Sequence, residues 1–336
     1  MQKVSIVIPN WNGADNLPSC LDSLQAQSLS AHIIVVDNGS QDSSVNLLNK
    51  KYPDVEIIRL PENRGFAGGV NAGIKQAIKL GSDYVALFNN DAVADKDWLK
   101  NLVQQMDKIS RTGIVTSKIM SIDKKHLDST GDQYTTWGLP YPRGRGEEVG
   151  DIYDQDINIF GASGGASLYR VKMLKEIGLF DEDFFAYNED VDISFRAQLA
   201  GWKVAYEPRA KAYHKIGATS SRIKDFTVYH TMKNLPMLFW KNVPWQLMPR
   251  MLPRFNLAYW GIFFSAVKRG QGIAAMKGLG HFILLIPKKT MERHVIRNRR
   301  AVSVAYIASM LTYDLPPNAS KLRALRSRWW KLKGKA

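Results

Sequence analysis

The run Asn89-Asn90-Asp91 directly follows the apolar segment Tyr84–Phe88 (YVALF). It therefore places three oxygen-bearing side chains at the end of one buried strand. A hard divalent cation prefers oxygen ligands and often completes its shell with water and substrate phosphates. A polar strand cap is the simpler interpretation of Asp91 taken alone. The run therefore indicates a candidate cation site that other residues must support.

A second candidate is the acidic run Tyr187–Asp192 (YNEDVD), in which Glu189 and Asp190 are adjacent. At the start of a helix, carboxylates interact favourably with the positive end of the helix dipole, so capping explains them without any catalysis. Neighbouring helical residues point in different directions, however, so one carboxylate can cap while the other faces a cleft. A carboxylate there is suited to act as general base for a hydroxyl that becomes acidic only as a new bond forms.

Three weaker signals accompany these runs. Asp37 ends an apolar run before Asn38-Gly39-Ser40, and binding of a base or ribose is as well supported as an Asx-turn. The stretch ENRGFAGGVNAGI (62–74) only loosely resembles the dinucleotide-binding pattern G-x-G-x-x-G. It indicates either a glycine-rich helix packed on a sheet or a flat backbone against which a nucleotide lies. In the second case Arg64 would be free to bind phosphate or base. Isolated histidines are usually solvated or hydrogen-bonded, but His214 beside Asp91 would favour Mn²⁺ over Mg²⁺.

The elements that position these residues alternate along the first hundred residues. Short β-branched apolar runs predict buried parallel strands, and amphipathic spacing between them predicts helices with Asp42 and Asp95 as N-caps. The predicted strands are Val4–Pro9, Ile33–Asp37, Val55–Leu60 and Tyr84–Phe88, and the helices are Leu17–Gln27, Ser44–Lys51, Phe66–Leu80 and Lys96–Ile109. This order predicts a Rossmann-like, doubly wound α/β fold with a mostly parallel sheet, whose ligands gather at the carboxyl ends of the strands.

Beyond Ser121 the pattern changes. Residues 121–156 are rich in Gly, Pro and charge, which predicts a long loop able to move over a site. Helices are predicted at Val171–Gly178 and Val191–Ala200, and residues 203–214 are predicted to form an edge strand that ends at His214.

The charge is unevenly distributed. The 336 residues carry a net charge of +15, but residues 237–336 hold 19 Lys and Arg and only two acids, a net of +17, which leaves −2 for residues 1–236. A nearly neutral globular part followed by a basic part predicts two regions, 1–236 and 237–336. The single cysteine, Cys20, excludes an internal disulfide framework and suits a reducing cytosol. The N-terminus predicts a strand and no signal peptide.

The basic region predicts an association with an anionic membrane surface. Its apolar stretches, Phe255–Val267 and Ile273–Ile286, are too short or too interrupted to span a bilayer. Basic segments with aromatic anchors lie in the membrane interface and are attracted to anionic lipid. The aromatic anchors are Trp240, Trp245, Trp260, Trp329 and Trp330. A helical extension packed on the catalytic region or on a partner subunit is the alternative.

Taken in order, the motifs resemble the inverting glycosyltransferases of family 2, which have the GT-A fold. The resemblance covers about residues 4–221 and rests on SIVIPNWNG, VVDNGSQD, NRGFAGGVNAGI, FNNDA and FDEDFFAYNEDVDISFR; residues 227–242 match less clearly. The branch that it most resembles includes bacterial rhamnosyl- and galactofuranosyltransferases of cell-wall, lipopolysaccharide and other surface polysaccharide assembly. The resemblance implies a GT-A catalytic domain over 1–236, with a nucleotide-binding half (about 1–110) and an acceptor half (about 111–236), followed by the mainly helical basic region.

The resemblance also implies roles for single residues. Asp190 matches the catalytic base, with Glu189 beside it. Asp91 matches the metal ligand that bridges the ion to the diphosphate, and His214 matches a histidine that completes the metal site in some members. The implied nucleotide-sugar-binding set is Pro9, Asn10, Asn12, Asp37, Arg64, Asn71, Asn89, Asn90 and Asp91. Asn89 and Asn90 stand where the family commonly has aspartates, which predicts weaker ion binding in the absence of nucleotide.

The implied reaction is a metal-assisted direct displacement. A hexose or pentose, such as rhamnose or galactofuranose, passes from a UDP- or dTDP-sugar to a hydroxyl of a glycan or lipid-linked acceptor, with Mn²⁺ or Mg²⁺ as cofactor. We expect a cytoplasmic enzyme, peripheral on the inner face of the plasma membrane, that binds no nucleic acid. Two alternatives remain: a non-catalytic nucleotide-sugar-binding relative, and a pyrophosphorylase-like nucleotidyltransferase. The second should have a Gly-rich, Arg-containing loop where this chain has Asn10-Trp11-Asn12-Gly13.

Overall fold

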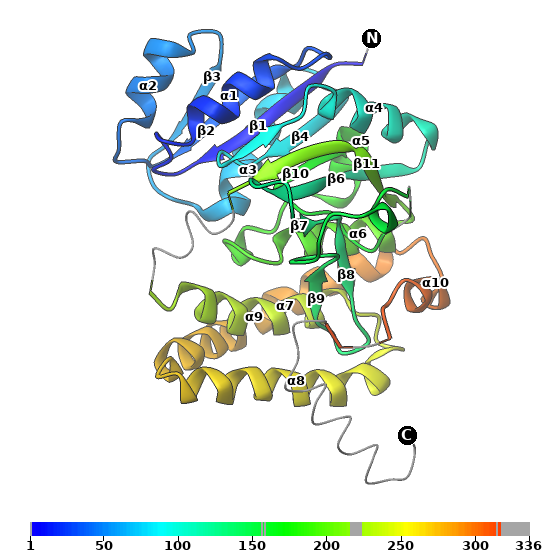
Figure 1. The fold of residues 1–336 in the computed structure, drawn as a ribbon. Helices are drawn as coiled ribbons and strands as arrows, with labels where there is room; N and C mark the ends of the chain where they lie inside the picture. The colour runs from blue at the N-terminus through cyan, green and yellow to red at the C-terminus, as the bar shows by residue number, and fades with distance from the viewer. Residues whose placement is uncertain (1, 156, 158, 216–223, 314, 317–336) are drawn as a thin grey trace.

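The structure is a computed structural model that describes residues 2–155, 157, 159–215, 224–313 and 315–316. A nine-stranded mixed sheet with helices on its faces forms one part of the molecule, and helices α7 to α9 form a layer next to it (Figure 1). This α/β architecture with a helical C-terminal region confirms the predicted fold class.

The first hundred residues fold as their sequence pattern predicts. Each β-branched run forms a strand, which is largely buried in β1, β2 and β4 but only partly buried in β3, and each amphipathic stretch forms a helix that turns its apolar side to the sheet. The elements are β1 (Val4–Asn10), α1 (Leu17–Gln25), β2 (His32–Asn38), α2 (Ser44–Lys51), β3 (Glu56–Leu60), α3 (Gly65–Lys79), β4 (Tyr84–Phe88), β5 (Ala92–Ala94) and α4 (Trp98–Lys108). The predicted bounds differ from these by at most two residues.

The sheet has the order β3-β2-β1-β4-β10-β6-β11-β5. Strands β1 to β4, β6 (Thr112–Ser121) and β11 (Lys203–His214) run in one direction, and β10 (Ala166–Arg170) runs against its neighbours β4 and β6. Because β2 and β4 pair with opposite sides of β1, the strand order reverses there. The carboxyl ends of β1 and β4 therefore border a crevice of the kind in which doubly wound sheets bind ligands.

Helix α3 lies close to this sheet because it is rich in glycine. A Cβ atom built on Gly73 would lie 2.3 Å from Cγ1 of Val7 in β1, a distance that no real side chain tolerates. The stretch 62–74 therefore serves close helix–sheet packing, one of the two interpretations that its sequence allowed.

Three local predictions were wrong. The N-caps of α2 and α4 are Ser43 and Asp97, because each helix begins one to two residues later than an Asp42 or Asp95 cap requires. Strand β11 is no edge strand, because β5 pairs with its last residues, Ala212 to His214.

Residues 121–155 are more ordered than the long loop that the sequence predicts over 121–156. They contain β7 (Leu127–Ser129), which pairs with β6, the hairpin of β8 (Asp132–Tyr134) and β9 (Pro140–Pro142), and the 3₁₀ turn η1 (Asp151–Tyr153). The hairpin closes through backbone bonds between Thr135 and Leu139, where Gly138 supplies a positive φ. The region therefore forms a fixed wall beside the sheet.

The remaining elements join the sheet to the helical layer. They are α5 (Val171–Ile177), η2 (Glu182–Phe184), α6 (Glu189–Leu199), α7 (Phe226–Asn242), α8 (Met248–Lys268), α9 (Gly272–Asn298) and α10 (Val304–Ser309). Side chains from α6, α7, α8 and α9 share one apolar core with Tyr134 and Phe160. The boundary predicted at residue 236 falls within α7, so the two regions are joined by a continuous helix.

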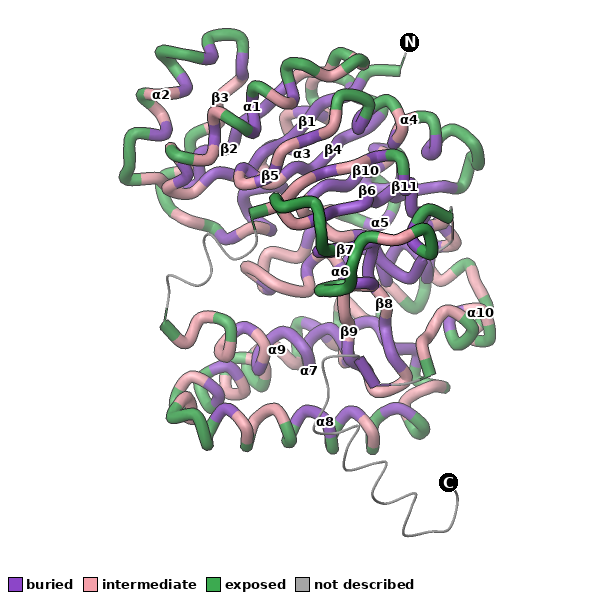
Figure 2. Tube along the Cα trace, viewed as in Figure 1, coloured by how far each residue is buried: buried purple, intermediate pink, exposed green. Residues whose placement is uncertain are grey.

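The helical layer is less buried than the sheet. The central strands are buried along most of their length, whereas α8 and α9 alternate between buried and exposed positions (Figure 2). Within the described residues, none of the helices has both the length and the apolar character that a bilayer crossing requires. The predicted anchors Trp329 and Trp330 lie outside the described residues.

Candidate functional site

A cavity of about 510 Å³ lies at the carboxyl ends of the central strands. Side chains from the ends of β1, β2, β4 and β11 form one side, and residues that precede or begin α6 and α7 form the other. It is lined by Pro9, Asn10, Trp11, Asn38, Asn63, Gly65, Phe66, Asn89, Asn90, Asp91, Phe185, Ala186, Tyr187, Glu189, His214 and Phe226. Its position at the reversal of strand order is where this fold binds ligands.

Asp91 and His214 meet at one end of the cavity. Nε2 of His214 lies 3.0 Å from Oδ1 of Asp91, and Nδ2 of Asn89 lies 3.4 Å from the same nitrogen. Strand pairing causes this approach, because β11 and β5 pair in a register that sets His214 opposite Ala92. The sequence placed both residues at strand ends; the structure brings them together.

The other ring nitrogen of His214 is also held. Its Nδ1 lies 2.8 Å from Oδ2 of Asp128 in β7, and Asp128 forms an ion pair of 2.7 Å with Arg145. Burial opposes protonation of His214, but the hydrogen bonds to Asp128 and Asp91 outweigh it and raise the pKa of the imidazole to about 9. The histidine is thus oriented by a carboxylate on one nitrogen while the other faces the cavity, as in many metal-binding histidines.

These donors suit a divalent cation. A carboxylate oxygen and an imidazole nitrogen that lie 3.0 Å apart and face one cavity can converge on a single ion once the histidine has lost its proton. The amide of Asn89 adds an oxygen without adding charge. The residues therefore fit the cation that the sequence predicted.

Glu189 and Asp190 begin α6, as predicted. Asp190 accepts hydrogen bonds from the backbone N–H groups of Gly164 (3.0 Å) and Val191 (2.8 Å) and lines a second cavity of about 190 Å³. Glu189 lines both cavities, and so do Phe66, Asn89 and His214. The two cavities therefore adjoin, with Glu189 shared by both and Asp190 in the smaller one.

The acid pair is less acidic than free carboxylates. Burial, followed by the charge of Asp190, raises the pKa of Glu189 well above its usual range. Burial also raises the pKa of Asp190, against the hydrogen bonds from Gly164 and Val191. Burial and then the charge of Asp190 also raise the pKa of the nearby Asp132. A carboxylate with a raised pKa is a stronger base, which is useful for removing a proton from a hydroxyl.

Three further predicted residues, Asn10, Asn12 and Asp37, lie at or just after the ends of β1 and β2. Asn10 accepts a hydrogen bond of 2.7 Å from Asn90, and Asn12 links the first two strand-end loops through Gln41 and Ser40. Asp37 is buried but does not line the cavity, and its Oδ1 has no hydrogen-bond partner among the described residues. An unpaired buried oxygen is costly, so a donor group would satisfy it.

Arg64 and Asn71 are occupied by protein partners instead. Arg64 forms an ion pair with Glu182, and Asn71 exchanges hydrogen bonds with the backbone of Phe180 and also donates to Glu182. Neither lines the cavity. Their side chains tie α3 to the segment that leads into α6, and their predicted nucleotide contacts stay predictions.

Several cavity residues escaped the sequence reasoning. Asp128 and Arg145 lie in the segment predicted as a loop, where nothing in the local pattern distinguishes them. Phe185, Tyr187 and Phe226 form an aromatic wall of the larger cavity. The sequence did offer one signal for this wall. Phe185 and Tyr187 directly precede the polar run Asn188-Glu189, and their spacing does not fit the apolar face of the helix that follows.

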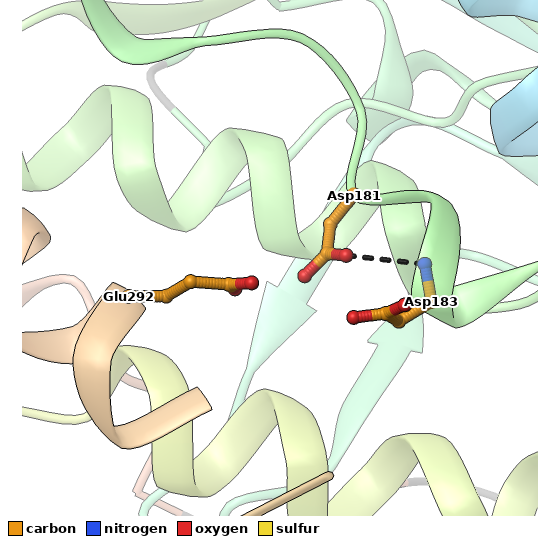
Figure 3. Close-up of side chains that lie close together, drawn as sticks. All are labelled: Asp181, Asp183 and Glu292. Atoms are coloured by element: carbon orange, nitrogen blue, oxygen red, sulfur yellow. Dashed lines mark hydrogen bonds between the residues drawn. The ribbon is translucent and has the colours of Figure 1, made fainter. Parts of the chain in front are cut away.

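A group of three carboxylates lies outside the cavity. Asp181, Asp183 and Glu292 direct their side chains toward a shared space (Figure 3), with oxygens within 4.8 Å of one another. Nζ of Lys289 already lies 2.5 Å from Asp181, 2.7 Å from Asp183 and 3.0 Å from Glu292. The lysine ammonium thus supplies the positive charge, and we assign this cluster a structural role.

Comparison with known proteins assigns the class. Residues 5–178, more than half of the chain, match the family model described as glycosyl transferase family 2, and the chain therefore belongs to this family. The protein is a family 2 glycosyltransferase.

Curated relatives match over part of their length. Poly-beta-1,6-N-acetyl-D-glucosamine synthase of Staphylococcus epidermidis is 25% identical over 222 residues, which cover 65% of this chain and 51% of that protein. The synthase of the same name from Staphylococcus aureus (strain MSSA476) is 23% identical over the same shares. The chain spans about half the length of the curated relatives that it matches.

Solved structures share the fold. Residues 1–349 of TarS from S. aureus superpose with a TM-score of 0.55 at 19% identity, covering 91% of this chain and 89% of that chain. The same residues of TarS in complex with UDP-GlcNAc superpose with a TM-score of 0.56 at 18% identity, with the same coverage of both chains. The mannosyltransferase PcManGT from Pyrobaculum calidifontis, in complex with GDP-Man and Mn²⁺, gives 0.53 at 16% identity and covers 91% and 86%.

The buried His230 behind the aromatic wall gives a prediction about acid stability. Burial and then the charge of Lys233 lower the pKa of His230 to about 4. The unfolded chain binds a proton near pH 6.5, so His230 leaves stability intact above that pH and reduces it as the pH falls toward 4. We expect His230→Phe to gain roughly 2–3 kcal/mol in unfolding free energy relative to wild type between pH 7 and 4.5. Urea unfolding at both pH values measures this, and parallel pH profiles would contradict it.

Proposed function

We propose that the chain is an inverting glycosyltransferase that transfers a sugar from a nucleotide diphosphate to a hydroxyl of a glycan or lipid-linked acceptor. The observation that carries the proposal is the pair of adjoining cavities: Asp91 lines the larger one, Asp190 lines the smaller one, and His214 and Glu189 line both. The nucleotide occupies the larger cavity beside β1 and β2. The acceptor hydroxyl reaches Asp190 where the two cavities adjoin.

The donor that we propose to test first is UDP-GlcNAc. The named relatives and the TarS complex concern N-acetylglucosamine, so they support a UDP-hexose donor. Rhamnose and galactofuranose on dTDP or UDP remain the alternatives that the sequence suggested.

In the proposed reaction, Asp190 takes the proton of the acceptor hydroxyl. The freed oxygen attacks the anomeric carbon from the face opposite the diphosphate, a C–O bond forms, and the bond between the anomeric carbon and the phosphate oxygen breaks. The nucleoside diphosphate leaves with the electron pair, and the anomeric configuration inverts. Hydrogen bonds from Gly164 and Val191 fix the Asp190 carboxylate, and its raised pKa favours proton removal.

Asp91 and His214 would hold Mn²⁺ or Mg²⁺ beside the diphosphate, with Asp128 holding the histidine ring in place. When bound, the ion neutralises charge that develops on the leaving diphosphate. Asn89 and Asn90 contribute no charge, so ion binding should depend on the phosphates. For the same reason a nucleotide-sugar-binding relative without turnover is the second candidate function.

Replacing Asp190 tests the catalytic proposal. An amide keeps the shape but cannot accept the proton, and its single oxygen can accept only one of the two backbone hydrogen bonds from Gly164 and Val191. We therefore expect Asp190→Asn to lower turnover by about 10²–10⁴-fold while the Kd for the nucleotide stays within about threefold. Incorporation of labelled sugar from UDP-GlcNAc and from dTDP- and GDP-sugars into a bacterial membrane fraction measures turnover, with EDTA as metal control.

Asp54→Asn, at an exposed position outside the cavities, is the matched control and should be fully active. Full activity of Asp190→Asn would remove this residue from the role of base. Nucleotide binding by the wild type without any turnover would support the binding relative.

We further propose that α8 and α9 hold the enzyme on an anionic membrane surface. Leu257, Trp260 and Phe264 repeat at helical spacing on α8 and are exposed, as are Ile273 and Leu284 on α9. The exposed Lys268, Arg269 and Lys277 lie between Phe264 and Leu284, and anionic lipid attracts such positive charges. A cytoplasmic location at the inner face of the plasma membrane would bring the enzyme to lipid-linked acceptors.

Flotation tests the membrane proposal. We expect the full chain to float with vesicles of phosphatidylcholine and phosphatidylglycerol (3:1) at low salt, and less with phosphatidylcholine alone. Leu257→Ser with Phe264→Ser should reduce flotation, whereas Ile122→Ser, another exposed apolar residue, should not. A wild-type chain that stays in the soluble fraction contradicts the proposal. A stable oligomer in that fraction would instead assign the helices to a partner subunit.

A further inference from the structure

The segment Phe184–Asn188, between η2 and α6, has an unusual backbone. Phe185 has φ 63° and ψ −63°, and the N–H of Ala186 donates to the carbonyl of Phe184 at 2.8 Å, which defines a γ-turn of the rare, strained kind. Tyr187 and Asn188 also have positive φ values, 69° and 68°. Bulky aromatic residues adopt this conformation only at a cost, and such cost is typically retained at functional sites.

Helix α7 holds this strained segment in place. Nδ2 of Asn234 donates to the carbonyls of Phe184 (3.1 Å), Ala186 (2.7 Å) and Tyr187 (2.8 Å). Nζ of the neighbouring Lys233 donates to the carbonyls of Asp183 and Phe184. Asn234 is fully buried, so these hydrogen bonds are shielded from water.

Helix α3 supports the segment from the other side. The N–H of Ala67 donates to the carbonyl of Phe185 at 3.2 Å. Gly65 permits this approach, because a Cβ atom there would lie 2.3 Å from the same carbonyl oxygen. The turn is therefore fixed by two helices before any ligand binds.

The fixed turn presents aromatic rings to the larger cavity. Phe185, Tyr187 and Phe226 line it, with ring centroids 5.9–6.2 Å apart for the pairs that include Phe226. His230 packs behind them, stacked on Phe185 at 5.4 Å. The lowered pKa of His230 keeps this backing uncharged at neutral pH.

We propose that Phe185, Tyr187 and Phe226 form the subsite that binds a saccharide ring of the acceptor; this rests on the proposed transferase function. The apolar C–H face of a pyranose or furanose ring matches an aromatic surface, and its hydroxyls need polar neighbours. Such neighbours are present in Glu189 and in Thr227, whose Oγ1 lies 3.3 Å from the Tyr187 hydroxyl.

Chain connectivity favours the acceptor over the nucleobase. The turn is followed directly by Glu189 and Asp190, so a ring on Phe185 or Tyr187 lies on the side of the acid pair. The polar residues that suit a nucleoside, Asn10, Asn38 and Asn63, come from the ends of other strands. A rigid, strained turn also fixes the acceptor relative to the base, which is what an efficient displacement requires.

Saturation-transfer NMR tests the subsite on the full-length chain. The probes are methyl β-D-glucopyranoside, methyl N-acetyl-β-D-glucosaminide and methyl α-L-rhamnopyranoside at millimolar concentration, with and without UDP and MnCl₂. We expect at least one glycoside to bind with saturation on its ring protons. Phe185→Leu and Tyr187→Leu, which keep an apolar side chain but remove the ring, should each weaken its Kd by roughly 3- to 10-fold.

Controls separate this proposal from folding and from the donor site. Tyr313→Leu, at an exposed aromatic position outside both cavities, should leave glycoside binding unchanged, and the melting temperatures of the variants show that they fold. The proposal is overturned if no glycoside binds the wild type, if binding survives both substitutions, or if they weaken UDP binding instead. Glycoside binding without any nucleotide binding would contradict the donor proposal and leave this one standing.

Discussion

The pairing of β1 with β2 on one side and β4 on the other decides where this molecule can bind a ligand. Backbone hydrogen bonds on both edges of β1 leave the carboxyl ends of β1 and β4 open to a shared crevice. Into that crevice the chain directs amides and a carboxylate from the residues that follow each strand. The antiparallel β10 then separates β4 from β6 and brings Gly164 and Gly165 beside Asp190 and Asn89.

Buried charges connect the helical layer to this crevice. Lys241 of α7 lies 2.6 Å from Asp181 and 2.9 Å from Asp192, and Asp192 also pairs with Arg196 inside α6. Removing one partner of such a group leaves an uncompensated buried charge, which is strongly destabilising. The helix that carries the acid pair is therefore anchored by the C-terminal helices, which contribute to the geometry of the site as well as to any membrane contact.

Much of the fold follows from local sequence pattern. The β-branched runs from Val4 to Phe88 specify the strands because burial on both faces favours such residues. Asp91, His214 and Asp190 could be identified because each stands at the end of a strand or the start of a helix. The glycine-rich stretch allowed either close packing or nucleotide contact, and the pattern could not choose between them.

Other parts of the site depend on contacts between distant segments. Asp128 reaches His214 only because β7 pairs with β6, and no local pattern signals that pairing. The strained turn at Phe185 was unpredictable because positive φ values are normally read from glycine or asparagine. Arg64 and Asn71 belong to the glycine-rich motif for which the sequence suggested nucleotide contact. In the structure, Arg64 pairs with Glu182 and Asn71 bonds the backbone of Phe180, so neither side chain lines the cavity. Tertiary hydrogen bonds thus decide which polar residues face the ligand.

The central claim is that Asp91 joins a nucleotide diphosphate to a divalent cation in the larger cavity. A thermal-shift screen of the wild type and Asp91→Asn against UDP-, dTDP- and GDP-sugars, each with and without Mn²⁺, tests it most directly. We expect one nucleotide sugar to raise the melting temperature of the wild type only when Mn²⁺ is present, and Asp91→Asn to lose this shift. No shift with any pair, or an equal shift in the variant or without metal, would contradict it.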